Sequence, residues 1–144
     1  MWKEIVISNT ESFSFKDPVK KDLLTVFEER LGMAIPKSLK SCLSESDGIF
    51  GEYQQGLIWP IDRIIHDNLE FRNDKDFKEL YMPFNHILFF ADAGNGDQFF
   101  YPVQAGEIRK NDIFVWNHED DSRSWIAPSL EKYLEWWLIG KIEI

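Results

Sequence analysis

Two short stretches of the sequence collect side chains that could do chemistry. One is Asp92-Ala93-Gly94-Asn95-Gly96-Asp97, and the other is His118-Glu119-Asp120-Asp121. Carboxylates and a histidine at this spacing can hold a divalent metal, act as acid and base in hydrolysis, or offer a negatively charged rim to a partner. The residue types therefore allow three kinds of site.

A metal or phosphate site fits the pattern poorly. Zinc sites usually take three or four His and Cys ligands, whereas the second stretch offers His118 alone, and adjacent residues of an extended chain point in opposite directions. A calcium loop would need a carboxylate or amide in place of Gly94 and a glutamate in place of Val103. The glycines join two predicted strands, whereas phosphate-binding glycines open a helix. We expect no metal and no cofactor.

A catalytic carboxylate pair is the second possibility, for instance Asp97 with Glu119. An acidic protein nearly always contains some such pair, so the pair alone does not indicate catalysis. His66 and His86 have no recognisable nucleophile or ligand nearby in the sequence. We therefore expect no enzyme, with a metal-dependent or acid–base hydrolase as the least favoured alternative.

The charge balance favours a protein partner. The chain has 16 basic and 25 acidic residues and a formal net charge of −9. That charge disfavours direct binding to nucleic acid and suits a basic protein, although it could equally serve solubility alone. The single cysteine, Cys42, excludes an internal disulfide. No apolar run reaches the ~20 residues of a membrane span, and charges near the N-terminus do not fit a signal peptide, so we expect a cytoplasmic protein.

The surrounding elements must position these stretches. Apolar periodicity and turn residues predict one domain, 1–144, with its core at about 18–139. We expect an α+β fold, with a mostly antiparallel sheet of about four to six strands and helices packed on one side. Asn73–Asp76 is predicted to be a loop. The predicted helices span 17–31, 36–47, 61–69 and 129–138, and the predicted strands span 57–59, 87–91, 99–103, 113–116 and 125–127.

The order of several motifs resembles the SUKH superfamily. The resemblance covers most of the chain, from about Val19 to Leu138. It rests on Leu31-Gly32-Met33-Ala34-Ile35-Pro36, Asp47-Gly48, Trp59-Pro60, Met82-Pro83, the Gly96-Asp97 turn, the run 113–121 and Ser129-Leu130-x-x-Tyr133-Leu134.

The resemblance implies a mixed α+β fold without enzymatic activity. Bacterial members act as immunity proteins that bind and block toxins, often nucleases, and fungal members regulate cell-wall glucan synthesis. It also implies architectural roles for Gly96, Asp97 and Trp116, with Asp97 tying its turn to backbone N–H groups.

These observations lead to one hypothesis and one alternative. We expect an immunity protein whose attractive rim consists of Asp97, Glu119, Asp120 and Asp121, facing a basic toxin. Two tryptophans, Trp59 and Trp125, are candidate exposed anchors, and Gly94 and Gly96 form a structural turn. The alternative is a protein-interaction scaffold or regulator related to the fungal branch.

Overall fold

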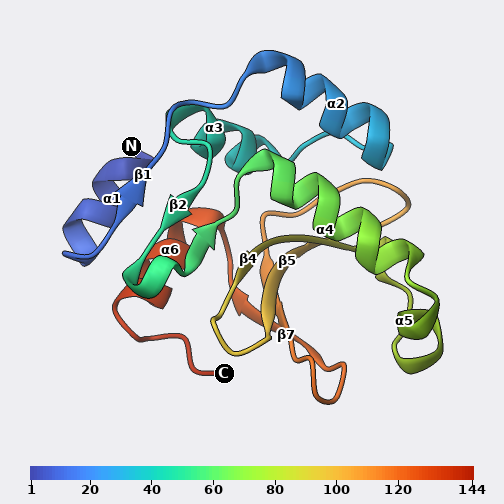
Figure 1. Cartoon of the computed structure of the whole chain (residues 1–144). Helices are drawn as coiled ribbons and strands as arrows, with labels where there is room; N and C mark the ends of the chain where they lie inside the picture. Colours follow the sequence, from blue (N-terminus) through green and yellow to red (C-terminus); the bar gives the residue numbers. More distant parts are fainter.

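The computed structural model describes residues 1–144 and has a mixed α+β architecture (Figure 1). This confirms the predicted fold class. The helices are α1 (Trp2–Asn9), α2 (Lys21–Leu31), α3 (Lys37–Glu45), α4 (Ile61–Asn73), α5 (Lys75–Leu80) and α6 (Leu130–Leu138), with short 3-10 turns η1 (Glu52–Gln54) and η2 (Phe84–His86). The strands are β1 (Ser14–Phe15), β2 (Ile49–Phe50), β3 (Gly56–Ile58), β4 (Ile87–Asp92), β5 (Gln98–Pro102), β6 (Ile113–Trp116) and β7 (Arg123–Ala127).

The strands form two antiparallel sheets, with the orders β1-β2-β3 and β4-β5-β6-β7. Consecutive strands of the larger sheet are neighbours, so its turns alternate between the two ends of the sheet. The backbone N–H of Trp59, just after β3, donates to the carbonyl of Phe90 in β4 at 2.8 Å. This bond joins the edges of the two sheets.

Helices contact both faces of the four-stranded sheet, whereas we expected them on one side. The ring of Phe89 packs against Phe71 of α4 at 5.1 Å, and the ring of Phe90 packs against Tyr133 of α6 at 5.2 Å. Tyr133 also contacts Phe99 of β5. The next residue, Phe100, points to the opposite face of the strand, because successive side chains alternate between the two faces. Strands with apolar residues on both faces need a cover on each side.

Several predicted elements are confirmed and others begin or end elsewhere. Gly32 ends α2 in the left-handed conformation, with φ 67°, and the Ser129 hydroxyl caps α6. The helix predicted from Asp17 begins only at Lys21, because the carbonyl of Asp17 accepts the N–H of Asp47 instead. The predicted loop at 73–76 is wrong, since Asp74 caps α5 through the N–H groups of two following residues.

The N-terminal helix α1 was not predicted. It is short and buries only Trp2 and Val6, so its apolar periodicity is weak. It lies beside α6 (Figure 1) and belongs to a buried core that extends from Trp2 to Ile142. No helix has both the length and the apolar character needed to cross a membrane.

Candidate functional site

Two turns meet at one end of the four-stranded sheet. The turn between β4 and β5 contains Gly94 and Gly96, whose φ angles of 86° and 100° suit glycine. Gly96 also lies against His118 of the neighbouring β6–β7 turn, so closely that a Cβ added to it would come within 2.9 Å of the His118 ring. The two stretches of carboxylates that are separate in sequence are thus adjacent in space.

Asp97 links these two turns from inside. It is only 4% exposed, its Oδ1 accepts the backbone N–H of His118 at 3.1 Å, and the same oxygen lies 2.6 Å from His118 Nδ1. Its own N–H donates to the side chain of Asn95. The contact with a backbone N–H agrees with the role that the resemblance implied, but Asp97 is too buried to belong to a rim. Its inclusion among the partner-binding residues was wrong.

Asp121 is also held by the protein itself. Oδ1 accepts the indole N–H of Trp116 at 2.7 Å and Oδ2 accepts the backbone N–H of Met82 at 2.9 Å, while the Arg123 guanidinium lies 3.1 Å away. Partial burial raises the pKa of Asp121, but these donors and the Arg123 charge outweigh it and hold the pKa below its usual value. Most of its hydrogen-bonding capacity is already used, so little remains for a partner.

Glu119 and Asp120 are the carboxylates of the turn that face solvent. The Asn117 side chain accepts the N–H of Glu119 at 2.8 Å, and Asp120 accepts the N–H of Ser122 at 2.9 Å. The bond from Ser122 lowers the pKa of Asp120, so this group stays charged at neutral pH. The exposed acidic rim therefore consists of these two residues.

The two candidate tryptophan anchors differ in exposure. Trp125 on β7 is 50% exposed, and its indole N–H donates to Asp112 at 3.0 Å. Trp59 is completely buried, its indole N–H donates to Asp92 at 2.9 Å, and the Arg63 guanidinium covers its ring at 4.1 Å. The expectation of an exposed Trp59 was wrong, because this residue lies where the two sheets join and Arg63 and Asp92 contact its ring.

A polar cleft beside the β4–β5 turn was missed. It has a volume of about 680 Å³ and lies between this turn and η1. Tyr53 in η1 is 93% exposed, and both Tyr53 and Gln54 have positive φ angles, of 56° and 61°. Such strain in consecutive non-glycine residues often marks functional segments. The signal in the sequence was Gly51 and Gly56, which bracket this polar segment.

The histidine and the carboxylates of the second stretch do not converge as ligands for one metal ion. His118 faces Asp97 and Asp121 faces Trp116, so the side chains of the second stretch diverge. The potential donors that do converge lie elsewhere, on α4, where those of His66, Asp67 and Glu70 fall within 4.8 Å of one another. These three make ordinary surface contacts that are ion pairs only when His66 is protonated, and the hydrogen bond to Asp67 raises the pKa of His66. The geometry at the end of the sheet suits binding by charge.

A family model described as SUKH_6, SMI1-KNR4 cell-wall, matches residues 21–134. The chain belongs to the SUKH (SMI1-KNR4) family. The match begins with α2 and ends within α6. It therefore includes every strand except β1, and it includes all residues of the two acidic turns. A search of curated proteins found no match to this SUKH chain.

Proposed function

We propose that this SUKH protein is a cytoplasmic immunity protein that neutralises a basic toxin by stoichiometric binding, without catalysis. The observation that supports the proposal is the pair Glu119 and Asp120, exposed on a turn that the buried Asp97 and the partly buried Asp121 hold in place. A nuclease is the toxin class that fits best, because its active site must be basic to hold phosphate.

The arrangement suits rapid and specific binding. Negative charge attracts a basic partner over distances of about 10 Å at 0.1 M salt, which raises the association rate. Because the turn is fixed by internal hydrogen bonds, little conformational freedom is lost on binding. Tyr53, which is 93% exposed beside the β4–β5 turn, and Trp125, which is half exposed on β7, are candidate aromatic contact anchors.

The first experiment identifies the partner and measures the contribution of the rim. The tagged chain is used to capture proteins from the native host, and affinity for the purified partner is measured by calorimetry at low and high salt. We expect Glu119→Lys with Asp120→Lys to weaken binding by at least about tenfold and to flatten its salt dependence.

A matched charge reversal provides the control. Glu28 and Glu29 are adjacent, exposed and on α2, far from the β6–β7 turn (Figure 1). Their replacement by lysine changes the net charge equally, so binding should weaken much less. Equal losses in the two double variants would mean that only net charge matters and that the interface lies elsewhere.

The toxin itself is tested by growth. The captured partner is expressed alone and together with this chain, and we expect growth arrest only when it is expressed alone. A partner that is harmless by itself would favour the second candidate function, a regulator or scaffold. The description of the matched family as SMI1-KNR4 cell-wall supports that alternative.

A further inference from the structure

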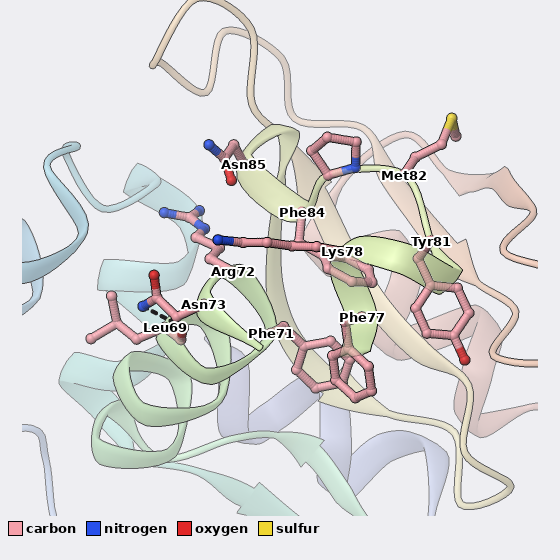
Figure 2. Close-up of a pocket in the computed structure, with 11 residues that line it drawn as sticks. Leu69, Phe71, Arg72, Asn73, Phe77, Lys78, Tyr81, Met82, Phe84 and Asn85 are labelled. Atoms are coloured by element: carbon pink, nitrogen blue, oxygen red, sulfur yellow. Dashed lines mark hydrogen bonds between the residues drawn. The ribbon is translucent and has the colours of Figure 1, made fainter. Parts of the chain in front are cut away.

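A second cavity opens away from the polar cleft, between the end of α4, α5 and η2 (Figure 2). Its volume is about 530 Å³, within the range of small-molecule sites. Three aromatic rings give it an apolar wall: Phe71 lies 4.9 Å from Phe77 and 5.2 Å from Phe84. Such a wall suits the flat or apolar body of a ligand.

The charged residues that line this cavity are both basic, although the whole protein is acidic. Arg72 and Lys78 line it, together with the amides of Asn73 and Asn85, and no carboxylate does. In the view of Figure 2, the charged ends of Arg72 and Lys78 point to the same side of the cavity. Two cations without an acidic neighbour in the lining are notable in a chain with a net charge of −9.

Arg72 has hydrogen-bonding capacity to spare. One of its terminal nitrogens donates to the carbonyl of Ile87 at 3.0 Å, and its Nε is buried without a partner. The other terminal nitrogen makes no hydrogen bond and is the donor left for a ligand. Neither Arg72 nor Lys78 takes part in an ion pair of the structure. Burial lowers the pKa of Arg72, which reflects the cost of a partly desolvated cation without a counterion. An anion would offset that cost.

We propose that this cavity binds a small organic anion, with an acidic group held by Arg72 and Lys78 and an apolar body against the aromatic wall. Arginine presents donors in a planar fork that matches a carboxylate, and lysine adds a second charge. This proposal does not rest on the proposed toxin-binding function, because the charge and lining of the cavity suit a different class of ligand.

The cavity wall is connected to the acidic turn. The Tyr81 hydroxyl donates to the carbonyl of His118 at 3.2 Å, and the Asp121 carboxylate holds Met82. Both Tyr81 and Met82 line the cavity. A ligand that shifts this wall is therefore expected to change the amide NMR signals of the β6–β7 turn.

The test is an amide NMR titration of the intact protein with benzoate, benzamide, inorganic phosphate and a short peptide with a free carboxyl end. We expect benzoate to shift amide signals of residues 75–85 and 118–121, with a dissociation constant on the order of millimolar, as is usual for so small a ligand. Benzamide lacks the charge and phosphate lacks the apolar body, so both should bind more weakly.

Two variants separate the cavity from general charge effects. Lys78→Gln should weaken benzoate binding by about fivefold, the order expected when one charge-assisted contact is lost. Lys75→Gln, on the same helix but outside the cavity lining, should leave it unchanged. Lys78 makes no hydrogen bond through its side chain in the folded protein, so its replacement should not disturb folding.

Four outcomes would overturn the proposal. Equal binding of benzamide would show an apolar cavity with no anion preference, and equal binding of phosphate would show an ion site that needs no apolar body. Much tighter binding of a short peptide with a free carboxyl end would replace the small molecule with a peptide terminus. The absence of any shift with benzoate at up to roughly 50 mM, about 50 times the expected dissociation constant, would exclude the site.

Discussion

At the scale of single residues, Asp121 shows how neighbours remove a carboxylate from a binding surface. It belongs to the same acidic run as Glu119 and Asp120, but it faces the indole of Trp116 and the backbone of Met82. Its negative charge stabilises the junction between the β6–β7 turn and the segment after α5. The exposed pair depends on this support for its position.

The lowered pKa of Asp121 predicts a pH-dependent contribution to stability. Because its folded pKa lies below the unfolded value of about 3.9, the contribution is fully present above that pH and is lost as the pH falls further. We expect Asp121→Asn to lower the free energy of unfolding by about 1–3 kcal/mol at pH 7, and by less at about pH 3. Urea unfolding at several pH values measures both.

Glu119→Gln is the control for this experiment, since Glu119 is exposed and belongs to the same turn. Its effect should stay within about 0.5 kcal/mol at every pH. A loss in the Asp121 variant that remains constant from pH 7 to pH 3 would contradict the assigned role of its charge.

At the scale of elements, the β4–β5 turn depends on Gly96 for two reasons. Its φ of 100° disfavours other residues, and the His118 ring occupies the space of a Cβ. We expect Gly96→Ala to lower the free energy of unfolding by about 2–4 kcal/mol, because it combines backbone strain with crowding. The His118–Asp97 contact should also be displaced, which NMR signals of the His118 ring would report.

Gly106→Ala separates these two effects. Gly106 also has a positive φ, 77°, but nothing lies within 4 Å of its added Cβ. Gly106→Ala should lower the free energy of unfolding by about 1 kcal/mol, because it adds only the strain of a positive φ and no crowding. If both alanine variants lost the same stability in denaturant unfolding, crowding against His118 would be absent.

At the scale of the whole molecule, α1 is part of the core although it precedes the residues matched by the family model. Trp2 is 2% exposed, its indole N–H donates to Ser41, and its backbone N–H donates to Glu45 of α3. The helix thus covers α3 and α6 rather than standing apart from the fold.

Replacement of the buried Trp2 side chain by alanine should destabilise the entire protein. We expect Trp2→Ala to lower the free energy of unfolding by about 3–5 kcal/mol, as for other large buried aromatic residues. Ile7→Ala, at an exposed position of the same helix, should cost much less. Denaturant unfolding followed by circular dichroism measures both, and a Trp2 loss below about 1 kcal/mol would mean that α1 is dispensable.

The sequence alone determined the elements whose signals are local. The helix after Ser129, the helix end at Gly32 and the turn at Gly94–Gly96 follow from apolar spacing, capping and the need for positive φ. The motifs that resemble the SUKH superfamily were readable for the same reason, since they consist of such local signals in a fixed order.

Only the tertiary structure decided which of these side chains can meet a partner. Asp97 and Glu119 are both carboxylates beside turns, but one is buried against His118 and the other faces solvent. Arg72 and Lys78 belong to different helices. The cavity that both line exists because the chain turns at Asp74 and places α5 beside the end of α4. The physical reason is that burial and charge pairing depend on residues distant in sequence, whereas helix periodicity and turn conformation depend on neighbours.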